Sequence, residues 1–209
     1  MIDYRSYIPE DSNRIRETIE WSIRYSYQAT DPTLPRILLI GDSICNAYQG
    51  PVREMLSGTA NVTFWASSKC VTDPDYFREL DFVLKSDRGG YAVICFNNGL
   101  HSLLTDKGAW ETAYRAVLRF IADAYPESKH FAVLSTPLRS KEQNDRCLAI
   151  NAMTRAAAEE AAWPILDLYG AMDGFDRDTE MPDGVHWNSV AVAHQAEYLT
   201  HHIRGALIP

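Results

Sequence analysis

Short apolar runs alternate with longer amphipathic segments along most of the chain, and this alternation is the feature that most limits its fold. The first run, residues 34–40, has the apolar pattern of a strand buried on both faces of a parallel sheet. Strands that alternate with helices at this spacing imply right-handed crossovers and a sheet covered on both faces. We therefore predict the α/β class, as a three-layer α/β/α domain with a parallel sheet of about five strands.

The expected elements follow one another in regular order. Strands are predicted over residues 34–40, 61–66, 91–96, 130–135 and 164–168. Helices are predicted from Pro51 onward, where proline suits the first helical position, and over residues 76–85, 109–124, 144–162 and 189–203. No internal repeat or change of composition divides this region, and 209 residues are enough for one full-sized core.

The residues before the first predicted strand form a separate unit in this prediction. Three isoleucines recur there at four-residue spacing, and Asp11 stands where a capping residue belongs. We therefore predict a helix from Asp11 to about Tyr25. The chain is thereby divided into an N-terminal arm or helix, residues 1–33, packed on a core domain of residues 34–209.

Charge and composition argue against several classes of partner. The chain has 20 basic and 28 acidic side chains, a formal net charge of −8 and no block of basic residues, so we expect no nucleic-acid partner. Its apolar runs are far shorter than the roughly 20 residues that span a bilayer, so we expect no membrane partner. The N-terminal sequence lacks the features of a secretory signal, which predicts a cytoplasmic location. Four cysteines without a Cys-x-x-Cys pair indicate neither a zinc knuckle nor a disulfide framework.

Polar residues gather where three of the predicted strands end. A Gly-Asp-Ser sequence at residues 41–43 follows the first strand, Asn-Asn-Gly at 97–99 follows the third, and Asp-Gly-Val-His at 183–186 follows the fifth. Each motif alone has a structural explanation as a turn or a helix cap. Because ligands bind outside the carboxyl ends of parallel strands, the presence of all three motifs at such ends favours a functional site there.

These motifs resemble the sequence blocks of the SGNH hydrolases, the GDSL family of esterases and lipases, and the resemblance extends over about residues 34–203. It implies a three-layer enzyme of flavodoxin-like architecture with Ser43 as the nucleophile. It also implies that Asp183 and His186, from one loop, are the acid and the base. Asn98 matches the asparagine of the family's third block.

The sequence departs from the family pattern at two positions. The third block usually has glycine two residues before its asparagine, where this chain has Phe96. The second block usually has a glycine whose N–H points into the oxyanion hole, where this chain reads Ala-Ser-Ser-Lys-Cys at residues 66–70. A backbone N–H of Ser68 or Lys69 is the expected replacement, because every residue except proline carries one.

The chemistry of acyl transfer explains why these residue types are needed together. A serine hydroxyl becomes a good nucleophile when an imidazole takes its proton, and a carboxylate holds that imidazole in the right tautomer. Ser43, His186 and Asp183 fit these three roles. The negative charge that develops on the carbonyl oxygen needs hydrogen-bond donors, and the Ser43 N–H and the Asn98 amide are the expected pair.

Two further residues are candidates for lining the substrate pocket. His101 follows Asn98 by three residues, and it either faces the pocket or only hydrogen-bonds its own loop. Trp187 directly follows the expected base, and it either stacks on a substrate or belongs to the core. Acidic residues alternate between 176 and 183 in the manner of calcium ligands. An EF-hand loop needs glycine at its sixth position, where this chain has Met181, so we expect no metal.

The residues and the resemblance together predict a serine esterase that works through an acyl-enzyme, without a cofactor or a metal. Family substrates include acetylated sugars, lipids, thioesters and small esters. The absence of a lid-sized insertion and the net charge of −8 favour a short acyl group on a carbohydrate or a small molecule. Two alternatives stay open: a lysophospholipase or thioesterase of the same fold, and a non-catalytic α/β module that binds a ligand at the edge of its sheet.

Overall fold

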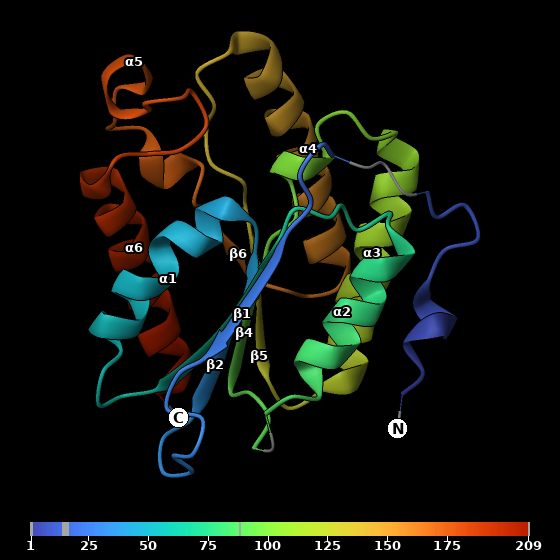
Figure 1. Cartoon of the computed structure of the whole chain (residues 1–209), viewed down its shortest axis with the longest axis vertical. Helices are drawn as coiled ribbons and strands as arrows, with labels where there is room; N and C mark the ends of the chain where they lie inside the picture. Colours follow the sequence, from blue (N-terminus) through green and yellow to red (C-terminus); the bar gives the residue numbers. More distant parts are fainter. Residues whose placement is uncertain (1, 14–16, 88, 209) are drawn as a thin grey trace.

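The central sheet of the molecule has six strands within the part of the chain that the computed structural model describes, residues 2–13, 17–87 and 89–208. The strand order is β1-β3-β2-β4-β5-β6, and Figure 1 shows the sheet between its covering helices. Every neighbouring pair is parallel except β1 and β3, which are antiparallel. The strands are β1 Ser22–Ser26, β2 Arg36–Gly41, β3 Asn61–Ser67, β4 Val93–Phe96, β5 Lys129–Val133 and β6 Ile165–Leu166.

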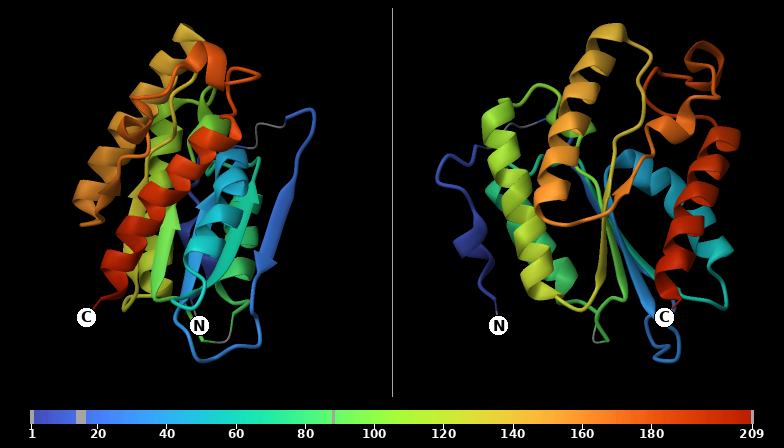
Figure 2. Two further views of the ribbon diagram at one scale, coloured as in Figure 1. Left: turned by 90° about the vertical axis from the view of Figure 1, so that its left-hand side faces the viewer. Right: turned by 180° about the vertical axis from the view of Figure 1, so that it is seen from behind.

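Helices cover both faces of this sheet, as the views from the side and from behind show (Figure 2). On one face α1 (Ser43–Met55) packs against α6 (Ser189–Leu207). On the other face lie α2 (Pro74–Leu84), α3 (Lys107–Ala124) and α4 (Lys141–Glu160). The predicted three-layer α/β/α architecture is confirmed, and the sheet contains one strand more than the sequence indicated.

Four short helices complete the part of the chain that the structure describes. The short elements are η1 Tyr4–Tyr7, η2 Leu100–Ser102, η3 Gly170–Met172 and α5 Arg177–Glu180. Among the described helices, none is both long enough and apolar enough to cross a bilayer.

The side chains of β2 explain why the sheet needs helices on both faces. Ile37 and Leu39 belong to the cluster under α1 and α6, whereas Leu38 and Ile40 belong to the cluster under α2, α3 and α4. Successive strand residues point to opposite faces, so a strand that is apolar at both sets of positions is stable only between two covering layers.

The helix predicted from Asp11 to about Tyr25 is wrong for the residues that the structure describes. Residues 22–26 form β1, which pairs with β3, so residues 22–25, which were expected to be helical, belong to a strand. The backbone hydrogen bonds that β1 makes to the open edge of β3 outweigh the local periodicity. This pairing joins part of the arm to the same sheet as residues 34–209.

The isoleucines that suggested this helix do not share an apolar face. Ile23 lies opposite Ala66 of β3 and packs on the core, whereas Ile19 is 75% exposed. Ile15 lies outside the described residues. Their four-residue spacing is therefore not the signature of a buried helical stripe.

Candidate active site

Ser43 is the first residue of α1 and follows the end of β2 almost directly. The Asp42 side chain caps the helix by accepting a hydrogen bond from the Ile44 N–H, with 2.9 Å between Oδ1 and N. A Cβ on Gly41 would lie only 2.6 Å from the Cβ of Cys45, so glycine is what allows the helix to start so close to the strand. The Ser43 N–H, in the first turn of the helix, has no intrahelical acceptor.

This turn also corrects the predicted start of the helix. The helix begins at Ser43, and Pro51 lies in its interior rather than at its first position. Aspartate is a preferred N-cap residue, and the cap that Asp42 provides fixes the start before the proline is reached.

The three side chains predicted to be catalytic form one hydrogen-bonded row. His186 Nε2 lies 2.8 Å from Ser43 Oγ, and His186 Nδ1 lies 2.7 Å from Asp183 Oδ2. The other oxygen of Asp183, Oδ1, accepts the N–H groups of Val185 at 2.9 Å and of His186 at 2.7 Å. A neutral imidazole that donates from Nδ1 to the carboxylate presents Nε2 as the acceptor for the serine hydroxyl.

The hydrogen bonds inside this loop act on the pKa of the acid. The His186 backbone N–H, the His186 side chain and the Val185 N–H hold the pKa of Asp183 well below its ordinary range. Asp183 is therefore a carboxylate under any ordinary assay condition. Behind the serine the effect is opposite: burial raises the pKa of the Asp42 carboxyl, although the His101 imidazole and the Ile44 N–H act to lower it.

Asn98 lies beside the serine turn because β4 is the neighbour of β2. The Asn97 N–H donates to the Ile40 carbonyl at 2.9 Å, which continues the β2–β4 ladder to the residue before Asn98. Asn98 is 3% exposed, and its Oδ1 accepts the Val71 N–H at 3.2 Å and the Ser102 hydroxyl at 3.0 Å. Its Nδ2 donates one hydrogen to the Lys69 carbonyl at 2.9 Å. An amide carries two such hydrogens, and the second has no acceptor at hydrogen-bond distance among the described residues, although it interacts with the buried Tyr76 hydroxyl.

The backbone N–H groups expected as a third oxyanion donor are occupied. The Ser68 N–H donates to the Trp21 carbonyl at 3.1 Å, and the Lys69 N–H donates to Ser67 Oγ at 3.2 Å. Trp21 directly precedes β1, so the first of these bonds belongs to the unexpected pairing of β1 with β3. In this arrangement neither N–H is free to face a developing oxyanion.

His101 connects the loop after β4 to the arm. Its Nδ1 lies 2.6 Å from Glu17 Oε1, and its ring makes an edge contact with Trp21 at 6.0 Å between ring centroids. His101 is therefore positioned by the arm, a role that the sequence could not indicate because Glu17 stands 84 residues away.

Trp187 belongs to the core rather than to an exposed pocket wall. Its side chain is part of a small buried cluster with Met172, Met181 and Ala191, and the residue is only 6% exposed. Phe175 contacts its ring edge-on at 6.1 Å between centroids. The buried face leaves no surface on which a substrate ring would stack.

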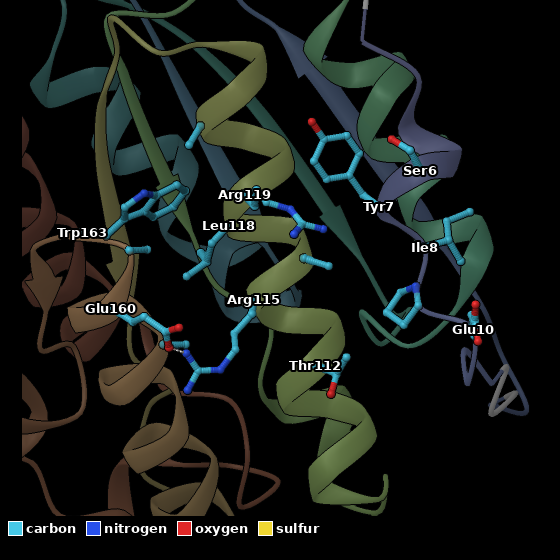
Figure 3. A pocket seen from close by; sticks show the side chains of 15 residues that line it. Ser6, Tyr7, Ile8, Glu10, Thr112, Arg115, Leu118, Arg119, Glu160 and Trp163 are labelled. Atoms are coloured by element: carbon cyan, nitrogen blue, oxygen red, sulfur yellow. Dashed lines mark ion pairs between the residues drawn. The ribbon is translucent and has the colours of Figure 1, made fainter.

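A separate open cleft of about 810 Å³ lies between residues 6–10 and α3 (Figure 3). Arg115 of α3 and Glu160 of α4 form an ion pair there, and Arg119 lies over the ring of Tyr7 at 5.3 Å. None of the predicted site residues lines this cleft. The row of Ser43, His186 and Asp183 is therefore the candidate active site.

Sequence reasoning missed one cation beside this row. The Arg139 N–H donates to the Gly184 carbonyl at 3.0 Å, and the Arg139 side chain covers Gly184, which is buried. Arg139 follows the strand β5, whose carboxyl end carries no motif, so the only signal was its place at that end.

Comparisons with known proteins identify the fold. No protein-family model matches the chain, and no curated protein matches it. An acetyl xylan esterase, AlAXEase, is similar in structure with a TM-score of 0.67 and 18% identity, over 80% of this chain and 99% of that one. A protein from Parabacteroides merdae described as a GDSL-like lipase has a TM-score of 0.64 and 15% identity, over 82% and 96%. The chain has the fold of the SGNH hydrolases.

A further enzyme with this fold comes from Geobacillus stearothermophilus. It is an acetylxylan esterase, similar with a TM-score of 0.63 and 15% identity, over 81% of this chain and 94% of that one. The chain thus spans nearly the whole length of each of these SGNH hydrolase structures. The three-layer α/β/α architecture that the resemblance implied is confirmed. The roles of individual residues rest on the geometry described above.

Proposed function

We propose that the protein is a serine esterase that hydrolyses short-chain acyl esters through an acyl-enzyme. The observation that carries this proposal is the position of His186, with one ring nitrogen 2.8 Å from Ser43 Oγ and the other 2.7 Å from Asp183. Such a row supplies a nucleophile, a base and the group that orients the base. The non-catalytic alternative gives no reason for this arrangement at the open edge of the sheet.

The proposed reaction begins when Ser43 Oγ attacks the carbonyl carbon and its proton passes to His186 Nε2. The negative charge moves to the carbonyl oxygen, where the Ser43 N–H and the second amide hydrogen of Asn98 are the proposed donors. The imidazolium then gives its proton to the alcohol oxygen as the carbon–oxygen bond breaks, and the alcohol leaves. A water molecule, deprotonated by the same imidazole, releases the acid and restores Ser43.

The proposed substrate is an acetylated carbohydrate or small molecule. Two of the similar structures are acetyl xylan esterases, which supports a short acyl group. The GDSL-like lipase from Parabacteroides merdae favours the second candidate, a lysophospholipase or thioesterase. Esters of one alcohol with acyl chains of increasing length separate the two, because the first candidate loses kcat/KM as the chain grows and the second gains it.

The test of the catalytic proposal is the rate of 4-nitrophenyl acetate hydrolysis by the protein and by Ser43→Ala. We expect Ser43→Ala to lower kcat by at least about 10³-fold, since loss of the nucleophile disables the whole row. Ser57→Ala is a matched control, because Ser57 is an exposed serine just beyond the other end of α1. Retention of turnover in Ser43→Ala, with normal folding by circular dichroism, would reject Ser43 as the nucleophile.

A further inference from the structure

One guanidinium lies against the loop that carries the proposed acid and base. A Cβ placed on Gly184 would come within 3.1 Å of Arg139 Nη2 and 3.2 Å of Arg139 Nε, so the guanidinium covers the middle of the loop between Asp183 and His186. Gly184 has a φ of +83°, a conformation that also favours glycine. The loop therefore has both the backbone shape and the bare Cα that this contact requires.

Arg139 differs from Lys69 and His101 at this edge of the sheet in having no acidic partner among the described residues. Lys69 Nζ lies 2.9 Å from Glu79, and His101 Nδ1 lies 2.6 Å from Glu17. No described carboxylate lies within 4 Å of Arg139, and the residue is exposed. In a chain with a net charge of −8, an exposed arginine without an acidic partner is available to an external anion.

A second arginine reinforces the positive charge at this place. Arg177 of α5 donates to the carbonyl of Leu138, the residue before Arg139, at 3.3 Å and to the Tyr169 hydroxyl at 3.4 Å. No described carboxylate lies within 4 Å of Arg177 either. The exposed carboxylate of Asp183 is negatively charged and would repel a second anion at this place. It is already hydrogen-bonded to the His186 imidazole at 2.7 Å, which takes up part of its charge.

The chemistry of the proposed reaction decides which part of a substrate meets Arg139. The imidazole must protonate the departing alcohol, so the alcohol oxygen comes within hydrogen-bond reach of His186 Nε2. Gly184 is two residues from His186, a separation of at most about 7 Å along the chain. Arg139, which covers Gly184, therefore lies near the imidazole that meets the departing alcohol.

We infer that Arg139 is a specificity-determining residue that binds a carboxylate on the alcohol portion of the ester. This inference rests on the proposed function and names the substrate class more closely: an acyl ester of an acidic alcohol, such as an acylated sugar acid. The planar fork of N–H groups on arginine matches the two oxygens of a carboxylate, which a neutral hydroxyl cannot replace.

The test compares Arg139→Gln with the unaltered protein on three esters. In 4-acetoxybenzoate the carboxylate lies on the alcohol, in methyl 4-acetoxybenzoate it is masked, and in the monoester of 4-nitrophenol with succinate it lies on the acyl group. We expect kcat/KM for 4-acetoxybenzoate to fall about five- to tenfold, mainly through KM, because one exposed charge-assisted pair is lost. The other two esters are expected to stay within about twofold. Arg139→Lys keeps the charge but lacks the planar fork, so its kcat/KM for 4-acetoxybenzoate is expected to lie between that of the unaltered protein and that of Arg139→Gln.

The matched control is Arg119→Gln. Arg119 is also exposed, has no described carboxylate within 4 Å and lies in the separate cleft against α3 (Figure 3). This variant changes the net charge by the same amount and is expected to leave the ratio of the three esters unchanged. An equal loss on all three esters in Arg139→Gln means that Arg139 only holds the loop in place, and it overturns the inference. Unchanged kcat/KM values for all three esters overturn it as well.

A binding measurement separates this inference from the proposed function. Calorimetric titration of 4-acetoxybenzoate into Ser43→Ala and into Ser43→Ala combined with Arg139→Gln needs no turnover. Weaker binding in the second protein supports the role of Arg139 even if the unaltered protein hydrolyses no ester, in which case only the esterase proposal fails. Equal affinity in the two proteins rejects the role of Arg139 even if the esterase proposal holds.

Discussion

Asn97 and Asn98 are neighbours in the sequence, but their side-chain amides are used differently. Both amide hydrogens of Asn97 have acceptors, the Val133 carbonyl at 2.8 Å and Ser135 Oγ at 3.1 Å. The Asn98 amide has one acceptor at hydrogen-bond distance among the described residues, the Lys69 carbonyl. Asn98 therefore has a hydrogen without an acceptor at hydrogen-bond distance among the described residues, with the buried Tyr76 hydroxyl as its neighbour, and the adjacent Asn97 is its natural control.

We expect Asn98→Ala to lower kcat by about 10²–10³-fold with a much smaller change in KM, because an oxyanion donor acts mainly in the transition state. The same variant should lower the free energy of unfolding by about 1–3 kcal/mol, since the buried Val71 N–H loses its acceptor. Asn97→Ala should lower the stability without this loss of kcat. Steady-state kinetics and urea denaturation of both variants are the measurements. Equal kcat values for the two would remove Asn98 from the site.

The pH dependence of activity should follow His186, since Asp183 stays ionised. Activity is expected to fall at acidic pH as the imidazole takes a proton and stops acting as a base. In Asp183→Asn the carboxylate that stabilises the imidazolium is gone, so kcat falls and the acidic limb of kcat/KM moves to lower pH. A pH profile of both proteins from about pH 4 to pH 9 checks this, and a limb that stays in place or moves upward would contradict the assigned pair.

At the scale of elements, β1 is tied to its neighbours by one buried carboxylate. Asp87, in the segment between α2 and β4, accepts the Ser26 hydroxyl at 2.8 Å, the Thr63 hydroxyl at 2.7 Å and the Tyr91 hydroxyl at 2.8 Å. Its side chain is 7% exposed. Burial acts to raise the pKa of Asp87, but the hydrogen bonds from Thr63, Ser26 and Tyr91 outweigh it and the pKa is lowered. The carboxylate thus joins β1, β3 and the start of β4 at the end of the sheet opposite the site.

We expect Asp87→Ala to lower the free energy of unfolding at pH 7 by about 3 kcal/mol, as for removal of one partner from a buried polar network. A lowered pKa means that this stability is present above the unfolded value of about 3.9 and is lost as the pH falls through the folded value. The difference between the two proteins should therefore shrink as the pH falls below that unfolded value. Asp81→Ala, which removes an i,i+4 pair with Lys85, is the control and should cost less than about 0.5 kcal/mol. Urea denaturation of both proteins at pH 7 and at a pH below the unfolded value is the measurement. A difference in the free energy of unfolding that stays constant with pH would show that Asp87 acts only through packing.

At the scale of the whole molecule, the sequence predicted what depends on local pattern. Runs such as residues 37–40 are apolar on both faces, and that alone requires two covering layers of helices. The parallel sheet then brings the ends of β2 and β4 together and places the loop after β6 beside them. The proximity of Ser43, Asp183 and His186 follows from this geometry, although Ser43 and His186 are 143 positions apart.

The features that the sequence did not predict depend on contacts between distant segments. β1 is defined by its partner β3, because its own five residues carry no strong strand pattern. The occupation of the Ser68 N–H follows from this pairing, and so does the position of His101 through Glu17. The place of Arg139 against Gly184 depends on how two loops meet at the edge of the sheet. The local periodicity of the sequence carries no information about such contacts between distant loops.

The antiparallel strand β1 also covers an edge of the sheet at which other copies of this protein could otherwise pair. Without β1, the side of β3 would offer a row of unpaired N–H and C=O groups on a strand rich in apolar residues, which is a template for intermolecular β-pairing and aggregation. β1 replaces that edge with five residues that include two serines and an arginine. By covering this edge of β3, β1 therefore opposes fibril-like growth, and loss of β1 is expected to promote aggregation.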